Sequence, residues 1–333
     1  MALKVAINGF GRIGRSVARI IAKRDDIDLV AINDLTEPDM IKYLLDNDSV
    51  HGHCGFDTEL LENDYIKMGS MKVKILSDKN PENLNFGSFG AETVLECTGV
   101  FLTKESAKIH LKDGVKKVVF SAPAKDDTDT FVLGVNEELY SGQAIISNAS
   151  CTTNCLAPVA RVLDDAFGIE KGLMTTIHSY TNDQNILDVK HKKDRRRTRA
   201  AAVNMIPTTT GAAKALSLVL PQLKGKLHGQ SVRVPTPNVS MVDLNILVKR
   251  DVTKDEVNKV LREKAEGDLK GIIAIDSEFQ VSQDFVGNSN SSIIAEDLTQ
   301  VIDGNMVKVM AWYDNEWGYS NRLIDMAIFV SRK

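Results

Sequence analysis

The chain carries little of what marks membrane, secreted or nucleic-acid-binding proteins. Its 333 residues hold 41 basic and 45 acidic side chains, a net charge of −4, so no positive excess draws it to nucleic acid or to an anionic surface. No apolar run approaches the ~18 residues that a membrane-spanning helix needs. The start of the chain lacks the basic and apolar regions of a secretory signal. We therefore expect a cytoplasmic protein without a membrane partner.

Cysteine is also scarce, since the chain has only Cys54, Cys97, Cys151 and Cys155. So few cysteines in a long chain without an export signal are typical of reduced thiols rather than of a disulfide framework. The pair Cys151 and Cys155 has no further Cys or His ligand at zinc-finger spacing, so no metal is predicted. The length of the chain exceeds what a single core usually holds, which favours two domains.

The N-terminal segment has the pattern of a dinucleotide-binding unit. Apolar residues predict strands at 4–8 and 29–32, and apolar residues at helical spacing predict a helix over 13–21. Gly9-Phe10-Gly11-Arg12-Ile13-Gly14 stands between the first strand and the helix, and Asp34 follows the second strand. A G-x-G-x-x-G motif in this setting, with an acid about 20 residues further on, is the dinucleotide-binding fingerprint. A glycine-rich turn without a ligand is the alternative.

Each residue type in this motif has a physical task. Gly9 permits the tight turn, Gly11 lets the backbone approach a pyrophosphate, and Gly14 allows the helix to pack closely on the strand. The helix N-terminus would bind the phosphates, and Arg12 would add a cation. Asp34 would accept hydrogen bonds from the adenosine ribose and repel a 2′-phosphate, which favours NAD over NADP.

Strand-like and helical stretches alternate throughout 1–150, which predicts an α/β fold with a doubly wound parallel (Rossmann) sheet. The carboxyl ends of its strands, near Thr98 and Ser121, are the expected cofactor site of this NAD-binding domain. The stretch 151–317 is strand-rich and predicts an α+β catalytic domain. We expect the last helical segment, 318–333, to pack back on the first domain.

A candidate nucleophile lies where the two predicted domains meet in the sequence. The segment Ser150-Cys151-Thr152-Thr153-Asn154-Cys155 follows a predicted strand at 144–147 and opens an apolar helix. A thiol at a helix N-terminus is favoured as the thiolate, the form that a nucleophilic cysteine needs. The alternative is a small buried apolar residue. His178 ends a predicted strand and is followed by hydroxyl side chains, so it is the candidate partner of Cys151.

Several segments of the second half predict anion binding. Seven Lys and Arg side chains lie within 190–199, without the interleaved aromatic residues that stack on bases, so an anion site or a subunit contact fits better than a nucleic-acid patch. Hydroxyls and a glycine at 208–213 open a helix in the manner of a phosphate cradle. Arg233 is a second candidate anion ligand. Together these features indicate a phosphorylated substrate.

These motifs resemble the phosphorylating glyceraldehyde-3-phosphate dehydrogenases of the bacterial type, over essentially the whole chain. The segments that carry the resemblance are Gly9–Gly14, 147–154, 178–181, 207–214 and Trp312-Tyr313-Asp314-Asn315-Glu316. The resemblance implies a homotetramer that oxidises glyceraldehyde 3-phosphate with NAD+ and inorganic phosphate to 1,3-bisphosphoglycerate, in glycolysis or gluconeogenesis.

The resemblance also implies roles for individual residues. Cys151 would form a thiohemiacetal and then a thioester, while His178 would lower the thiol pKa, take up its proton and stabilise the oxyanion. It gives Cys155 a structural role. One anion site would comprise Thr181, Asp183 and Arg199, and the other Ser150, Thr152, Thr210, Gly211 and Arg233. The cofactor site would comprise Gly9, Gly11, Arg12, Ile13, Gly14, Asp34, Thr98, Ser121 and Asn315, the last holding the nicotinamide carboxamide.

One segment departs from the family pattern. Val189-Lys190 stands where NAD-specific relatives usually have Leu-Pro, and one residue is added near Lys193-Asp194. A lysine there would weaken the bias against a 2′-phosphate, which leaves the strictness of NAD over NADP open. The alternative functions are an erythrose-4-phosphate dehydrogenase or, in another class, an RNA-binding or adhesion protein that uses the basic loop.

Overall fold

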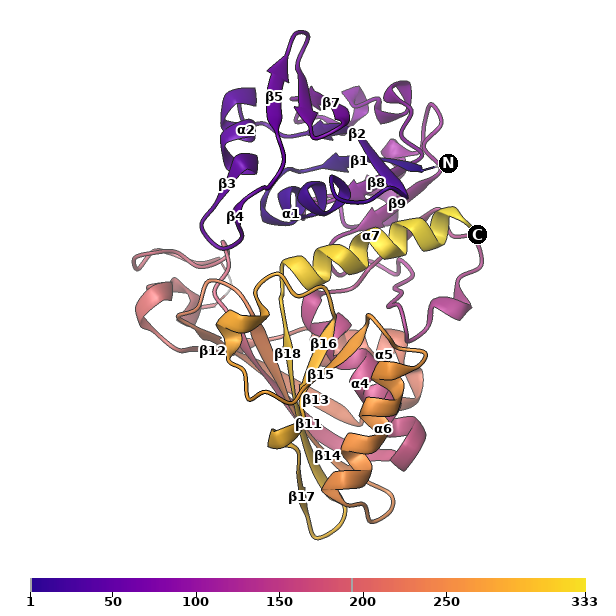
Figure 1. Cartoon of the computed structure of the whole chain (residues 1–333), viewed down its shortest axis with the longest axis vertical. Coiled ribbons are helices and arrows are strands. Elements are labelled where there is room, and N and C mark those ends of the chain that lie inside the picture. Colours follow the sequence, from indigo (N-terminus) through magenta and orange to yellow (C-terminus); the bar gives the residue numbers. More distant parts are fainter. Residues whose placement is uncertain (1, 193) are drawn as a thin grey trace. The chain divides into compact units, whose positions relative to one another are not determined.

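The computed structural model describes residues 2–192 and 194–333, which form two compact units (Figure 1). The first unit contains the chain up to Phe131, then Glu137–Ser150 and Ser320–Lys333. The second unit contains Val132–Asn136 and Cys151–Tyr319. No helix in the described part of the chain is long and apolar enough to cross a membrane.

The first unit is built on an eight-stranded sheet in the order β10-β9-β8-β1-β2-β7-β6-β5. The six strands from β10 to β7 run parallel, and β6 and β5 add an antiparallel hairpin at one edge. The bounds are β1 (Leu3–Asn8), α1 (Arg12–Ile21), β2 (Ile27–Asn33), α2 (Pro38–Asp46), β3 (Asn47–Asp48), β4 (Gly52–His53), β5 (Thr58–Leu61), β6 (Tyr65–Met68), β7 (Met71–Leu76), β8 (Thr93–Glu96), α3 (Lys104–Ala107), β9 (Lys117–Phe120) and β10 (Ile145–Ser147).

The position of β1 in this sheet determines where a ligand can bind. β1 pairs with β2 on one side and with β8 on the other, so the chain reverses its direction of travel across the sheet at β1. In doubly wound sheets the crevice at such a reversal, beyond the carboxyl ends of the strands, is the ligand site. The expected α/β class with an N-terminal Rossmann sheet is confirmed.

The second unit is a mixed sheet in the order β12-β13-β11-β14-β18-β16-β15, with β17 paired to β18. Its helices α4, α5 and α6 lie on one side of this sheet (Figure 1), and buried apolar residues such as Leu163, Leu244 and Val309 fill the space between. The bounds are α4 (Cys151–Phe167), β11 (Ile169–Ser179), β12 (Ile206–Thr209), α5 (Ala212–Val219), β13 (Leu227–Val234), β14 (Ser240–Val248), α6 (Lys254–Glu266), β15 (Ile273–Asp276), β16 (Ser292–Ala295), β17 (Gln300–Ile302), β18 (Met306–Tyr313) and α7 (Trp317–Ser331), whose greater part belongs to the first unit.

Candidate active site

A strained turn sets the start of the helix that carries Cys151. Ala149 is fully buried and has a φ of +56°, a left-handed conformation that costs a residue with a side chain about 1–3 kcal/mol. Its backbone N–H donates to Ser147 Oγ at 3.1 Å, which helps to hold the conformation. The turn makes Cys151 the first residue of α4, as the strand-turn-helix pattern predicts.

His178 lies next to the Cys151 thiol at the end of β11. Its Nε2 is 3.7 Å from Cys151 Sγ, and its Nδ1 is 2.7 Å from the Ser179 carbonyl oxygen. Arg233 Nη1, which can only donate, also lies 2.9 Å from Nδ1, so these two contacts hold the ring in place without fixing its tautomer. The imidazole is thus held with Nε2 next to the thiol, where the two groups can exchange a proton.

The register of β11 and β13 places a cation beside this imidazole. The two strands run parallel with Arg233 opposite His178, and Arg233 Nη1 donates to the Ser179 carbonyl at 2.9 Å. Burial and then the charge of Arg233 hold the pKa of His178 well below its usual range, so the imidazole is neutral. Burial likewise raises the pKa of the Cys151 thiol, whereas Arg233 and a hydrogen bond with Thr152 act to lower it.

Burial therefore opposes the thiolate form that a helix N-terminus favours. Desolvation of the sulfur is the largest influence on its pKa, and it favours the neutral thiol. A nucleophilic thiol in this setting needs a neighbouring base, and His178 Nε2 is the group at 3.7 Å from the sulfur.

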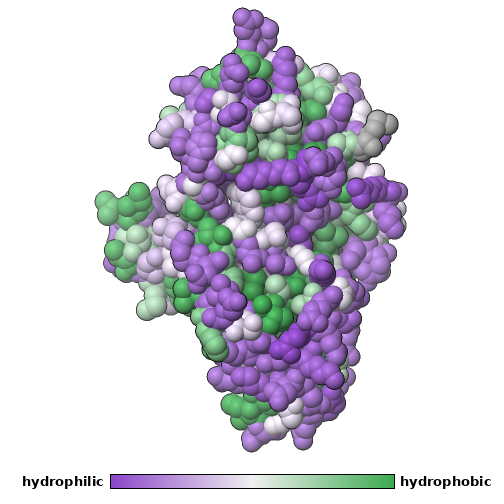
Figure 2. Space-filling model, viewed as in Figure 1, coloured by the Kyte–Doolittle hydropathy of each residue, from purple (hydrophilic) through white to green (hydrophobic). Residues whose placement is uncertain are grey.

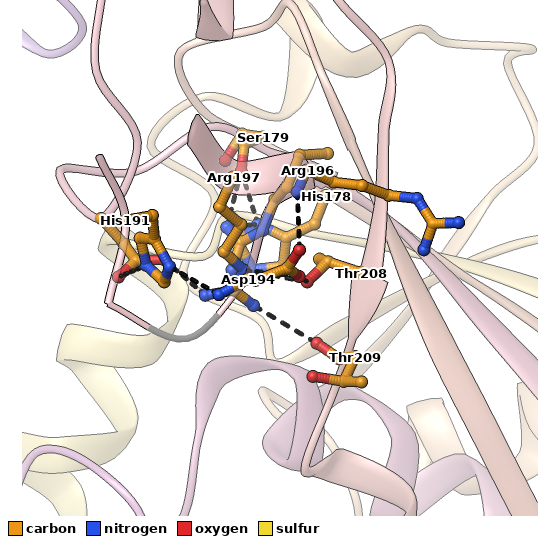
Figure 3. A network of polar contacts seen from close by, with 10 residues as sticks. His178, Ser179, His191, Asp194, Arg196, Arg197, Thr208 and Thr209 are labelled. Carbon is orange, nitrogen blue, oxygen red and sulfur yellow. Dashed lines mark hydrogen bonds and ion pairs between the residues drawn. The ribbon is translucent and has the colours of Figure 1, made fainter. Parts of the chain in front are cut away.

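An arginine other than the one expected lies beside Asp183. Arg197 forms an ion pair with Asp183 and donates from Nε to Thr208 Oγ1 at 2.9 Å. Figure 3 shows Arg197 with Thr208 and Asp194 in this network. Arg199 instead pairs with Asp188 at 2.7 Å, and its side chain is 60% exposed. Four of the five residues from Arg195 to Arg199 are arginines, so the sequence alone does not distinguish Arg197 from Arg199. The residue Lys193, near the expected insertion, lies outside the described residues.

The other expected anion ligands lie in two places. Thr210 and Gly211 precede α5, and Thr210 Oγ1 accepts from the Ala212 backbone N–H at 3.2 Å. Thr181 and Asp183 follow β11, whereas Ser150 directly precedes α4. Thr152 is only 4% exposed, and its hydroxyl is 2.9 Å from that of Tyr313, so it is engaged inside the protein.

A pocket of about 470 Å³ opens over the carboxyl ends of the strands in the first unit. Its lining includes Gly9, Gly11, Asp34 and Thr98, all expected from the sequence, and Asn8 and Asn33 at the ends of β1 and β2. The Asp34 carboxylate is fixed by hydrogen bonds from the backbone N–H groups of Phe10, at 2.7 Å, and Thr36, at 3.0 Å.

Close backbone packing around the motif explains two of its glycines. Gly9 has a φ of +94°, and a Cβ there would lie 2.7 Å from the Thr98 backbone nitrogen. A Cβ on Gly14 would lie 2.2 Å from the Gly9 carbonyl oxygen. This tight cradle fits a dinucleotide pyrophosphate, which needs backbone N–H groups at close range. Arg12, expected to add a cation there, forms an ion pair with Asp48 at 2.5 Å.

Glu96 opens the segment Glu96-Cys97-Thr98-Gly99, which the sequence predicts at the cofactor site, and it supports the pocket from inside the sheet. It is fully buried at the end of β8, where it accepts from Asn8 Nδ2 at 2.7 Å and from the Thr98 backbone N–H at 2.8 Å. These bonds tie the Thr98 turn to β1, and Ser121 N–H donates to the Glu96 carbonyl at 3.0 Å. The sequence signal for this structural role is an acidic residue in an otherwise apolar strand. In the second unit, Asn315 is held in a similar way, since its Oδ1 accepts from two serine hydroxyls at 2.9 and 2.8 Å.

Comparisons with known proteins match both halves of the chain. Residues 3–104 match the family model described as the NAD-binding domain of glyceraldehyde 3-phosphate dehydrogenase, and residues 150–315 match the model of its C-terminal domain. Among curated proteins, a glyceraldehyde-3-phosphate dehydrogenase of Priestia megaterium is 54% identical over 335 residues, covering 100% of this chain and 99% of the relative. Glyceraldehyde-3-phosphate dehydrogenase 1 of Bacillus subtilis is 53% identical with the same coverage, and an enzyme of that name from Streptomyces coelicolor is 50% identical over the full length of both chains.

Proposed function

The chain belongs to the glyceraldehyde-3-phosphate dehydrogenase family, and on this premise we propose which of its residues perform the reaction. It is an NAD-dependent oxidoreductase that converts glyceraldehyde 3-phosphate and inorganic phosphate to 1,3-bisphosphoglycerate. Cys151 is the proposed nucleophile and His178 the proposed acid–base residue. The observation that carries these roles is the 3.7 Å separation of Sγ and Nε2, with Nδ1 fixed by the Ser179 carbonyl.

The proposed steps move one proton between sulfur, imidazole and substrate oxygen. Cys151 Sγ attacks the aldehyde carbon, and the thiol proton passes through His178 Nε2 to the carbonyl oxygen, which gives a thiohemiacetal. His178 would then remove that hydroxyl proton, and NAD, held by the residues of the first-unit pocket, would supply the hydride acceptor that oxidation of this carbon requires. The resulting thioester is attacked by a phosphate oxygen. The sulfur departs with the proton held on His178, and the acyl phosphate is released.

Positive charge next to the catalytic pair supports the proposed phosphate sites. Arg233 lies against His178, and Arg197 lies close enough for its charge to act on both His178 and Arg233. Two arginines that repel each other in a buried site are stabilised by an anion between or beside them. We therefore place Arg197, rather than Arg199, in the anion-binding set with Thr181, Asp183, Ser150, Thr210, Gly211 and Arg233.

The proposed cofactor ligands are residues of the first-unit pocket together with those that the family resemblance adds, Asn315 among them. Asp34 would bind the adenosine ribose, and the N-terminus of α1 would bind the pyrophosphate. The set is Gly9, Gly11, Ile13, Gly14, Asp34, Thr98, Ser121 and Asn315. The Arg12 side chain forms an ion pair with Asp48, so we propose that backbone N–H groups, rather than this guanidinium, bind the phosphates.

A homotetramer is the proposed assembly, and an exposed apolar surface supports it. Ile186, Leu187, Val203 and Met205 are 84, 73, 77 and 74% exposed and lie in one segment of the second unit. This segment forms the projection at the left of Figure 1, and apolar side chains colour the same projection in Figure 2. Large exposed apolar patches of this kind mark protein–protein contacts. The proposed location is the cytoplasm, whose reducing conditions keep thiols such as the four free cysteines reduced.

The decisive experiment is an assay of NADH formation from glyceraldehyde 3-phosphate with and without inorganic phosphate. We expect turnover only with phosphate, and none in Cys151→Ser, which should still bind NAD. Activity retained in Cys151→Ser would remove that residue from the mechanism. Erythrose 4-phosphate and NADP+ belong in the same panel, because a preference for erythrose 4-phosphate, or equal kcat/KM with NAD+ and NADP+, would contradict the assignments. RNA binding should fade at physiological salt if it is purely electrostatic.

A further inference from the structure

Tyr313 connects the element that carries Cys151 to the element that carries His178. It ends β18 and is 1% exposed, and its hydroxyl lies 2.9 Å from Thr152 Oγ1 and 2.8 Å from Thr176 Oγ1. Thr152 directly follows Cys151 in α4. Thr176 precedes His178 by two residues in β11, so both side chains lie on the same face of that strand.

The Tyr313 ring also restricts the imidazole. It meets His178 edge to face, with ring centroids 6.0 Å apart and an interplanar angle of 76°. The imidazole is thus held at Nδ1 by the Ser179 carbonyl and along its ring by Tyr313. Burial raises the pKa of Tyr313, so its phenol stays protonated and can donate to one threonine while it accepts from the other.

The geometry between thiol and imidazole leaves little tolerance. The 3.7 Å separation of Sγ and Nε2 is within reach of a hydrogen bond to sulfur, and a displacement of about half an ångström would lengthen it beyond that reach. Thr152, whose hydroxyl lies 2.9 Å from that of Tyr313, also acts to lower the pKa of the Cys151 thiol. One phenol oxygen therefore contacts the side chain next to Cys151 in α4 and the side chain two residues before His178 in β11.

We propose that Tyr313 is a positioning residue of this reaction, which holds Cys151 Sγ and His178 Nε2 at transfer distance through Thr152 and Thr176. The inference rests on the proposed roles of Cys151 and His178. The alternative is a purely structural tyrosine, whose buried hydroxyl simply needs hydrogen-bond partners. In that case, removing the hydroxyl oxygen of Tyr313 would leave the reactivity of the Cys151 thiol unchanged.

Tyr313→Phe tests the proposal, because it deletes the oxygen and keeps the ring. We expect kcat to fall roughly tenfold, a part of the ~100- to 10,000-fold that a positioned acid–base group supplies, while the Kd for NAD stays within about twofold. The pH profile of Cys151 alkylation by iodoacetamide should move to higher pH by about half a unit or more, because the Thr152 hydroxyl, which acts to lower the thiol pKa, is no longer held by Tyr313. Wild-type values for both kcat and the alkylation profile would overturn the proposal.

Two further variants keep the test decisive. Thr176→Val removes the other hydroxyl of the bridge and should change the same two quantities; the double variant with Tyr313→Phe should be little worse than the worse single variant. If Tyr313→Phe does not fold, an unchanged alkylation profile in Thr176→Val overturns the proposal. Tyr140→Phe is the matched control, since this tyrosine is also buried and hydrogen-bonded, but it lies in the first unit and should change neither quantity. A wild-type enzyme without phosphate-dependent NADH formation would refute the proposed function instead.

Discussion

Two alanine substitutions in the cofactor cradle should have different effects: Gly14→Ala should lower the stability of the fold, and Gly11→Ala should weaken the binding of NAD. At Gly14, a Cβ would lie 2.2 Å from the Gly9 carbonyl oxygen and 3.3 Å from Ile7 Cγ2. The backbone of the turn or of α1 must therefore move by roughly 1 Å, since overpacked groups relax only by such shifts. The move costs about 1–3 kcal/mol, and alanine returns about 1 kcal/mol through its higher helix propensity. We expect a net loss of up to about 2 kcal/mol in the free energy of unfolding.

The same substitution at Gly11 meets open space. A Cβ there has no atom within 4 Å, and the φ of −71° suits any residue. Gly11 is the N-cap of α1, where alanine is less favourable than glycine by roughly 0.5 kcal/mol, so the stability should stay close to that of the wild type. The added methyl projects into the pocket that Gly11 lines, where the pyrophosphate has to approach. NAD affinity should fall at least about tenfold, equivalent to 1.4 kcal/mol.

Thermal unfolding without cofactor and calorimetric titration with NAD measure the two effects separately. Gly14→Ala should lower the Tm by several degrees, at about 2–4 °C per kcal/mol for a unit of this size. Gly11→Ala should leave the Tm nearly unchanged and weaken binding. A wild-type Tm in Gly14→Ala would refute the packing argument. Normal NAD affinity in Gly11→Ala would show that the pyrophosphate does not lie at the N-terminus of α1.

Further predictions concern the catalytic pair, the anion site and one ion pair. His178→Asn should move the alkylation profile of the thiol to higher pH, and an unchanged profile would contradict its role as the base. Arg197→Ala should raise the KM for phosphate at least about tenfold, whereas Arg199→Ala should change it less than about threefold. A larger effect of Arg199→Ala than of Arg197→Ala would instead identify Arg199 as the anion ligand. Arg24 lowers the pKa of Asp26, so their pair stabilises the fold at neutral pH and is lost as the pH falls through the range in which that carboxyl protonates. Arg24→Gln should therefore cost about 0.5–1 kcal/mol at pH 7, with a deficit in Tm that shrinks from pH 5 towards pH 3.

The cofactor cradle could be predicted from the sequence because its determinants are local. Gly9, Gly11 and Gly14 act within a single turn, and Asp34 follows the adjacent strand, so fixed spacing carries nearly all the information. Glu96 could not be assigned in the same way. Its partner Asn8 is 88 positions away in the sequence, and only the pairing of β1 with β8 brings the two together.

In the anion site, by contrast, neighbouring residues are distinguished only by their tertiary contacts. Arg197 lies in the short 3-10 turn Arg196–Thr198, and Arg199 directly follows it. No apolar periodicity indicates which side chain faces inward, so the choice is made by tertiary partners: Asp183 and Thr208 for one arginine, Asp188 for the other. Sequence reasoning could identify a cationic anion site here but not the arginine that forms it.

Two thiols on the same helix show what makes Cys151 different. Cys155 lies one turn further along α4, is fully buried, and has its sulfur 3.9 Å from the Ala311 carbonyl oxygen. Burial raises the pKa of Cys155 to about 12. Burial acts on Cys151 as well, yet at that position β11 adds an imidazole and β13 adds the charge of Arg233. The helix N-terminus contributes a position and a partial charge, but the sheet supplies the base and the cation. If the same Ser-Cys-Thr-Thr-Asn-Cys segment packed against a sheet without such a base and cation, neither of its two cysteines would be a reactive nucleophile.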